Sequence, residues 1–323
     1  MISKLKCSRC WLPFACAVAT LTVGFSALAQ QPYPSRAIEF IVPFGPGGGA
    51  DQLARKSGKL LESTLKVSVP VLNVPGATGA TGVAKLVSAA PDGYSMAIYI
   101  ADTHALLATS KPPYGIDDIT PVARMISAPS YLFVKSDGPI KSWADFEKAA
   151  KANPGALKVA TVGFGSVDDM TLTFLEGKGI KLNQVPYPKP SERYVSVLGG
   201  HVDVLYEQAG DVASFLKNKQ MLPIVVFGDK RAADFPGVPA SKELGYDIGL
   251  PQFRSVVVHG KTDPKTIKAL SDAFGKVAQT AEYKEFLKEQ FAAEDSYMPA
   301  DQARKFMRGE LETMKKLAGT KKK

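Results

Sequence analysis

Short apolar runs alternate with amphipathic segments along the first third of the chain. Residues 38–42, 67–74 and 95–100 are rich in β-branched and other apolar residues, which predicts buried strands. Residues 50–64 and 78–90 carry apolar positions at helical spacing, and the second of these segments ends at the turn sequence Pro91-Asp92-Gly93. A strand–helix–strand–helix–strand order predicts a parallel sheet with right-handed crossovers.

The same pattern begins again after residue 130. Strands are predicted at 131–134, 157–161, 184–187, 202–206 and 221–227, with helices starting at Ser142 and spanning 168–176 and 192–198. Residues 252–258 form a β-branched run that could return to the first unit, and three helical segments, 264–279, 281–290 and 299–317, follow it. The sequence therefore predicts a discontinuous lobe, 30–130 and 254–323, with a second lobe, 131–253, inserted. A ligand cleft is expected between the two.

Each predicted unit contains a glycine-rich turn between a strand and a helix. The first is the sequence PFGPGGG at 43–49, and the second is GFGS at 163–166. Backbone N–H groups at such turns and at helix N-termini bind anions, and the helix dipole adds to the attraction. Residues 45–51 and 163–168 are therefore two candidate anion-binding sets that face one cleft. The alternative is that these glycines only make tight turns.

The N-terminal residues and the cysteines indicate the compartment. A basic stretch at 4–9, an apolar segment at 11–25 and the sequence Ala27-Leu28-Ala29 together predict a cleaved signal peptide at 1–29. All three cysteines lie in that segment, so the mature chain has no disulfide, thiol nucleophile or Cys metal site. A secreted chain of this size without disulfides is typical of a bacterial periplasm.

Composition and charge restrict the function further. The chain has 323 residues, of which 45% are hydrophobic and 22% charged, as expected for a globular protein. The formal net charge is +9, and much of the excess lies in lysines after residue 314, which are expected to form a solvated tail. Nothing in the chain is typical of a nucleic-acid-binding module.

The motifs of common enzymes are missing from the sequence. The turn at 43–49 lacks the Gly-Lys-Ser/Thr of a P-loop, and Asn73-Val74 stand where a dinucleotide site requires an acid. The three histidines are widely spread without metal-ligand spacing, and Gly165-Ser166 lacks the Gly-x-Ser-x-Gly elbow of serine hydrolases. We therefore expect a binding protein with no cofactor and no metal.

Seven short motifs in a fixed order identify a family resemblance. The chain resembles the periplasmic substrate-binding proteins of tripartite tricarboxylate transporters, the Bug or TctC family. The motifs are YPSR at 33–36, VPFGPGGG at 42–49, NVPGA at 73–77, PDGY at 91–94, THA at 103–105, TPV at 120–122 and LGGHVD at 198–203.

The resemblance implies a fold and a function. It implies an α/β, two-lobed, type II periplasmic-binding-protein (Venus-flytrap) fold, in which each lobe is a mostly parallel sheet flanked by helices. It also implies a monomer that closes on a small organic carboxylate and delivers it to the permease subunits of a tripartite tricarboxylate transporter. A receptor that presents its closed form to a sensor kinase would have the same fold, and a periplasmic enzyme is the least favoured alternative.

The resemblance also implies that both turns contact the ligand, with one carboxylate held by backbone amides and ordered waters. It implies an acidic residue at the cleft, here Asp203, although an exposed carboxylate at a strand end would give the same pattern. The candidate ligand-binding residues from the two turns and the motifs are Phe44, Gly48, Gly49, Asp51, Thr103, Gly163, Gly165, Ser166, Tyr187 and Asp203.

Four charged residues depart from the pattern of the family. Asp169 replaces a histidine, and Arg193 and Arg254 stand where small or aromatic residues are usual, while Glu207 adds a further charge. Arg193 could clamp a second ligand carboxylate, or it could pair with Glu192 or Asp169 or face solvent. These residues are therefore candidate determinants of the ligand, which could be a di-, tri-, amino- or aromatic carboxylate. The acidic ones favour a ligand with an amine or several hydroxyls.

Overall fold

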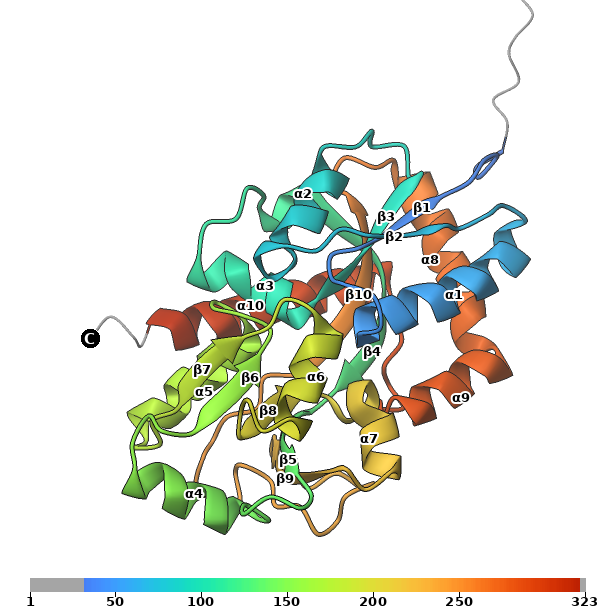
Figure 1. Ribbon diagram of the computed structural model, residues 1–323. Coiled ribbons are helices and arrows are strands. Elements are labelled where there is room, and N and C mark those ends of the chain that lie inside the picture. Colours follow the sequence, from blue (N-terminus) through green and yellow to red (C-terminus); the bar gives the residue numbers. More distant parts are fainter. Residues whose placement is uncertain (1–31, 320–323) are drawn as a thin grey trace, which may run out of the picture. The chain divides into compact units, whose positions relative to one another are not determined.

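The structure is a computed structural model that describes residues 32–319, so the predicted signal peptide lies outside the described residues. It contains two mixed sheets, each flanked by helices (Figure 1). We name the first sheet with its helices lobe 1 and the second sheet with its helices lobe 2. The strands of lobe 1 are β1 (Glu39–Val42), β2 (Val71–Asn73), β3 (Ser95–Ile100), β4 (Ile119–Ala128), β10 (Gln252–His259) and β11 (Met298–Pro299). Those of lobe 2 are β5 (Ser130–Lys135), β6 (Lys158–Thr161), β7 (Asn183–Pro186), β8 (Val204–Glu207) and β9 (Met221–Phe227).

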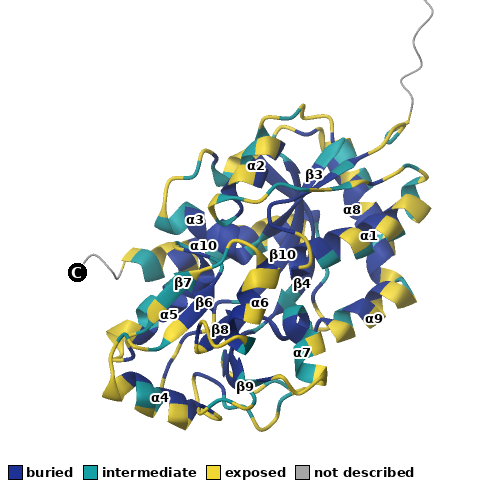
Figure 2. Cartoon of the chain, viewed as in Figure 1, coloured by how far each residue is buried: buried dark blue, intermediate teal, exposed yellow. Residues whose placement is uncertain are grey.

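Helices cover both faces of each sheet, and alternate residues of a strand enter different cores. Phe40 of β1 packs toward α1 (Gly49–Leu65) and α8 (Pro264–Gln279). Its neighbour Ile41 packs toward α2 (Ala80–Val87) and α10 (Ala300–Gly319) on the other face. Figure 2 shows the strands as a buried interior beneath half-exposed helices. The helices of lobe 1 are α1 (Gly49–Leu65), α2 (Ala80–Val87), α3 (Ala101–Thr109), α8 (Pro264–Gln279), α9 (Ala281–Glu289) and α10 (Ala300–Gly319), with short 3₁₀ turns η1 (Ala77–Gly79) and η2 (Ile116–Asp118). Those of lobe 2 are α4 (Trp143–Ala152), α5 (Val167–Gly177), α6 (Pro190–Leu198) and α7 (Ala213–Lys217), with the 3₁₀ turn η3 (Ala209–Val212).

The strand order shows that the two lobes share one topology. Lobe 1 has the order β11-β4-β10-β3-β1-β2, and lobe 2 has the order β7-β6-β8-β5-β9. In both, three parallel strands are followed by an antiparallel one, which is β10 in lobe 1 and β5 in lobe 2. The glycine turns follow equivalent strands, β1 and β6, and lead into the equivalent helices α1 and α5. The segments after β3 and β8 are likewise equivalent and begin α3 and η3.

Two segments connect the sheets. Pro129 lies between β4 and β5, and residues 228–251 lie between β9 and β10. The strand bounds place Ser130 in the second sheet and Gln252 in the first, one or two residues away from the ends expected from the sequence. The division into lobes at residues 131 and 253 stays a prediction.

Most predicted elements are present, but the sequence patterns did not indicate β4 or α3. Pro121 lies inside β4 at a register shift opposite Val257, where a missing N–H is tolerated. In α3, the consecutive residues Asp102, Thr103 and His104 are all buried, so the segment has no polar face that would show helical periodicity.

Candidate functional site

A cavity of about 30 Å³ lies where the first glycine turn approaches lobe 2. It contains six of the residues predicted for the site: Phe44, Gly48, Gly49, Arg193, Glu207 and Arg254. Their roles in ligand binding stay predictions. The complete lining from lobe 1 is Phe44, Gly48, Gly49, Ala50, Ile100, Asp102 and Arg254, and from lobe 2 it is Val162, Pro190, Arg193, Tyr194, Glu207, Gln208 and Asp211.

The two glycines that begin α1 permit the close approach of the lobes. A β-carbon on Gly48 would lie 2.7 Å from Cγ and 3.0 Å from Cβ of Pro190, the first residue of α6. A β-carbon on Gly49 would overlap the carboxylate of Asp211 and the guanidinium of Arg254. Any larger residue at these positions therefore changes how the lobes meet.

Arg254 and Asp211 form a buried ion pair across the lobes. Nη2 of Arg254, on β10, lies 2.7 Å from both carboxylate oxygens of Asp211, on η3. The same nitrogen donates to Oε1 of Gln208 at 3.2 Å, and Nη1 donates to Oε1 of Gln290 at 3.3 Å. The guanidinium is therefore held between one carboxylate and two amide oxygens.

Arg193 and Glu207 form a second buried ion pair, within lobe 2. Nη2 of Arg193 donates to Oε2 of Glu207, and Nη1 donates to the carbonyl of Tyr187 at 3.4 Å. Burial raises the pKa of Glu207 to about 7, although the charge of Arg193 acts in the opposite direction. The pairing of Arg193 that the sequence left open is thus with Glu207 rather than with Glu192 or Asp169.

Asp102 and Asp168 bring two carboxyl groups together from opposite lobes. Oδ1 of Asp102 accepts from the backbone N–H of Val167 at 3.1 Å, and Oδ2 of Asp168 accepts from that of Val162 at 2.8 Å. The two carboxyl groups also hydrogen-bond to each other, which requires a shared proton. Burial raises the pKa of both groups, although the charge of Arg193 acts in the opposite direction.

Each lobe therefore places an aspartate side chain at the N-terminus of a helix in the other lobe. Asp102, which follows β3, accepts from the first N–H of α5 in lobe 2. Asp211, which follows the equivalent β8, lies against Gly49, the first residue of α1 in lobe 1. Helix N-termini attract negative charge, so each glycine turn receives an acidic side chain of the other lobe.

Two buried polar atoms on the cavity wall lack partners. Nε of Arg193 and the hydroxyl of its neighbour Tyr194 have no hydrogen-bond partner among the residues that the structure describes. Both side chains line the cavity and are at most 5% exposed. Such groups are costly to bury unless a water or a ligand satisfies them.

Four of the remaining predicted residues lie outside the cavity lining, and each has a hydrogen-bond partner in the protein. The carboxylate of Asp51 accepts from Gly47 N–H and from Asn73 and Arg55. The hydroxyl of Thr103 donates to the carbonyl of Thr78. Ser166 caps α5 by accepting from Asp169 N–H, and the backbone carbonyl of Tyr187 accepts from Arg193.

The expectation that Asp203 faces the cleft is wrong for this conformation. Asp203 is exposed and precedes β8, whereas Glu207, which lines the cavity, ends that strand. One oxygen of its carboxylate accepts from the N–H of Lys158 at 2.8 Å. The strand-end alternative therefore describes its position.

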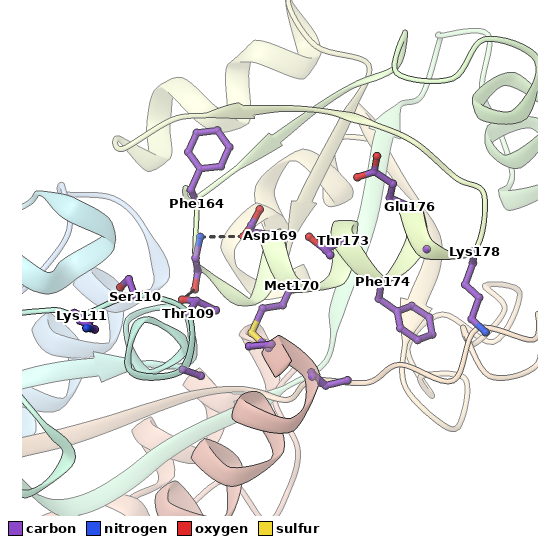
Figure 3. Close-up of a pocket in the computed structure, with 15 residues that line it drawn as sticks. Thr109, Ser110, Lys111, Phe164, Asp169, Met170, Thr173, Phe174, Glu176 and Lys178 are labelled. Atoms are coloured by element: carbon purple, nitrogen blue, oxygen red, sulfur yellow. Dashed lines mark hydrogen bonds between the residues drawn. The ribbon is translucent and has the colours of Figure 1, made fainter. Parts of the chain in front are cut away.

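Gly165 and Asp169 line a second, larger hollow of about 990 Å³ (Figure 3). It lies among the end of α3, the helix α5 and the end of α10, with Phe164 at its rim, 65% exposed. Asp169 accepts from the N–H of Gly165, whose carbonyl accepts from Thr109 of lobe 1. Gly163 also contacts lobe 1, because a β-carbon there would lie 2.8 Å from Oγ1 of Thr78. The second turn thus meets lobe 1 beside the cavity rather than in its wall.

The sequence patterns missed Asp102, Tyr194, Gln208 and Asp211. The available signal was the ends of the predicted strands, because ligands of α/β sheets bind beyond the carboxyl ends of the strands. Asp102 follows β3 within two residues, and Gln208 directly follows β8.

In the range 32–319 no helix has the length and apolar character needed to cross a membrane. The same residues contain no cluster of His, Cys, Asp and Glu suited to a metal ion. Burial lowers the pKa of His104 to about 4, and its ring nitrogens contact Tyr99 and the carbonyl of Met307.

Two α/β lobes that meet around a small polar cavity are the two-lobed fold of periplasmic binding proteins. A family model described as tripartite tricarboxylate transporter family receptor (TctC) matches residues 53–321, and the chain belongs to this family. The resemblance to the Bug/TctC proteins is therefore confirmed.

Individual relatives agree with this assignment. The chain is 31% identical over 306 residues to the UPF0065 protein in the gbd 5' region of Cupriavidus necator, covering 93% of this chain and 92% of the relative. It is 29% identical to protein BugT of Bordetella pertussis, covering 90% and 91% of the two chains. The structure of MatC from Rhodopseudomonas palustris with bound malate superposes with a TM-score of 0.81 at 23% identity, covering 88% of this chain and 100% of MatC.

The shared proton of Asp102 and Asp168 predicts how stability depends on pH. A carboxyl group with a raised pKa binds its proton more tightly in the folded protein, so its contribution to stability is present below the unfolded pKa and is lost as pH rises through the folded pKa. The loss should begin near the unfolded Asp value of about 3.9, and Glu207 extends it through about 7. Urea unfolding measured across this range should show a falling free energy of unfolding.

Asp168→Asn tests this prediction, because an amide can donate to Asp102 without a shared proton. We expect the variant to be more stable than the wild type at about pH 8, by about 1 kcal/mol. Asp272→Asn, at an exposed position on α8, is the matched control and should keep the pH dependence of the wild type. A loss of stability in Asp168→Asn at pH 8 would contradict the shared-proton description.

Because the hydroxyl of Tyr194 has no hydrogen-bond partner among the described residues, we expect its removal not to destabilise the protein. Tyr194→Phe should leave the free energy of unfolding unchanged or raise it by up to about 1 kcal/mol, because no protein hydrogen bond is lost and an unsatisfied buried hydroxyl is removed. Tyr283→Phe, which removes a 2.9 Å bond to the carbonyl of Met125, should cost about 1 kcal/mol. Equal costs in urea unfolding would show that the Tyr194 hydroxyl has a partner in the protein.

Proposed function

We propose that this protein binds a small organic carboxylate between its lobes and delivers it to a tripartite tricarboxylate transporter in the membrane. The observation that carries the proposal is the pair of glycine turns, which follow equivalent strands of the two lobes and each meet the opposite lobe. Membership of the TctC receptor family supports it, as does the bound malate of MatC.

The chemistry of the cavity suits a carboxylate. A buried carboxylate is costly unless hydrogen-bond donors surround it. The N-terminus of α1, the free Nε–H of Arg193 and the hydroxyl of Tyr194 all lie at the cavity wall. The ligand would bind without being altered, since His104 is buried and engaged elsewhere, and the protein would act as a monomeric periplasmic receptor rather than as an enzyme.

Ligand entry requires the lobes to separate. A cavity of about 30 Å³ has room for about two water molecules, which is less than any dicarboxylate occupies. The ligand must therefore enter an open form, in which Arg254 and Asp211 have parted. Pro129 and residues 228–251 are the segments where the chain passes between sheets, and they are the natural hinge.

A thermal-shift screen tests the proposed function. Purified protein is heated with mono-, di-, tri-, amino- and aromatic carboxylates, with sugars and divalent metals as comparison compounds. A ligand that binds only the folded protein stabilises it by about 2.7 kcal/mol at one hundred times its Kd, which raises the melting temperature. A shift with sugars or metals and with no carboxylate would contradict the proposal.

Gly48→Ala should hinder closure of the lobes while leaving the protein folded. Its φ of −81° and ψ of 170° suit alanine, so the main direct cost to lobe 1 is a weaker helix cap of up to about 1 kcal/mol. The new methyl group would collide with Pro190 when the lobes close. We expect affinity for any carboxylate found in the screen to fall at least tenfold, measured by isothermal titration calorimetry.

Gly309→Ala is the matched control for this experiment. Gly309 lies within α10, and a β-carbon there would meet no atom within 4 Å. This variant should bind as the wild type does and gain about 0.5–1 kcal/mol of stability from the better helix former. Unchanged affinity in Gly48→Ala would remove the first glycine turn from the binding site.

A further inference from the structure

The wall of the cavity presents hydrogen-bond donors that the protein does not satisfy. Nε of Arg193 can only donate, and the hydroxyl of Tyr194 can donate as well. The two residues are neighbours on α6, and the guanidinium carbon of Arg193 lies 5.4 Å from the centre of the Tyr194 ring. A ligand that fits this wall therefore carries an acceptor such as a carboxylate oxygen.

The part of the cavity wall formed by Asp102 has no lysine or arginine in an ion pair with that carboxyl group among the described residues. Asp102 lines the cavity, and Asp168 lies behind it in hydrogen-bonding contact. The charged groups that face this pair are Arg193 on α6 and Glu207 on β8, while Gln252 on β10 donates to Asp102 at 3.2 and 3.3 Å. Arg193 is already paired with Glu207, so the two aspartates are held together by a proton rather than by a positive charge.

The charges around the cavity do not balance. In the described part of the chain, Asp102, Asp168, Glu207 and Asp211 face only two guanidinium groups, those of Arg193 and Arg254. With one shared proton and Glu207 ionised, the site has an excess of one negative charge. A plain dicarboxylate would add two more negative charges to a closed, buried site, whereas a group with its own ammonium would not.

We propose that the ligand is a small amino-carboxylate, with its carboxylate on Arg193 Nε and Tyr194 Oη and its ammonium beside Asp102. This inference rests on the proposed function and names the ligand class of the same site. The ammonium lies beside Asp102 while the proton stays between Asp102 and Asp168, so it supplies the missing positive charge at the contact between the lobes.

The test uses compounds that share a carbon skeleton and differ in one group. Succinate, malate and aspartate carry hydrogen, hydroxyl and ammonium at the same carbon, and glutarate, 2-hydroxyglutarate and glutamate form a longer set. Glycine and alanine are compared with acetate and propionate. Calorimetry on the purified protein at constant pH and ionic strength should show at least tenfold tighter binding of the amino member in whichever set binds.

The outcomes of the panel separate the amino-carboxylate inference from the proposed function. Binding of a plain or hydroxy acid as tightly as its amino analogue would overturn the amino-carboxylate inference and leave the proposed function standing. Failure of every carboxylate in all sets and in the wider screen would reject both. The two failures are therefore distinguishable.

Asp102→Asn tests whether the ligand ammonium lies beside Asp102. The asparagine oxygen can still accept from Val167 N–H, but the charge is lost. We expect the preference for the amino member over the plain acid to fall below about threefold, while Asp272→Asn keeps the full preference. A tenfold preference that survives in Asp102→Asn would overturn the assignment of the ammonium to Asp102.

Tyr194→Phe tests whether the ligand carboxylate binds the hydroxyl of Tyr194. It also keeps the inference testable if Asp102→Asn fails to fold. Its stability should equal or exceed that of the wild type because the hydroxyl has no partner in the protein. Affinity for the amino member and for the plain acid should fall together, by about tenfold. Unchanged affinity for both would remove Tyr194 from the site and overturn this part of the inference.

Discussion

Buried charge at the contact between the two lobes is the constraint on which the rest of the site depends. Asp102, Asp211, Arg193 and Arg254 are all nearly inaccessible where the lobes meet. Charges in such a place must be paired or protonated, because their desolvation otherwise outweighs the packing gained. On the proposed function, closure is therefore favourable only in arrangements that satisfy these groups, and a ligand would be selected by how well it satisfies them.

The shared topology of the lobes explains why the groups meet as they do. A glycine turn follows the equivalent strands β1 and β6, and an acidic segment follows the equivalent strands β3 and β8. When the lobes face each other, the acid of each is brought to the helix N-terminus of the other, where its charge is favoured. The two glycines at the start of α1 allow this approach because they have no side chain to hold the lobes apart.

The alternation of apolar strands and amphipathic helices predicted the two-lobed α/β fold. Helices cover both faces of each sheet, so the strands appear in the sequence as apolar runs and the helices as segments with one apolar face. The alternation failed for α3, where Asp102 to His104 are all buried and leave no periodic pattern. The glycine turns indicated where the site lies, and Arg193, Glu207 and Arg254 stood out as unusual charges. Their pairing could not be predicted, because it depends on contacts between segments far apart in the sequence. Asp203 shows the opposite error, since a motif at the start of a strand lies at the wrong end of the sheet for the cavity.

A crystal structure of the protein with the tightest-binding carboxylate of the panel tests the central claim most directly. We predict a ligand carboxylate within hydrogen-bond distance of Arg193 Nε and Tyr194 Oη, between Gly48 and α6, with both glycine turns still facing the opposite lobe. Electron density for the ligand in the outer hollow beside Phe164, or anywhere else away from Arg193 and Gly48, would contradict the account.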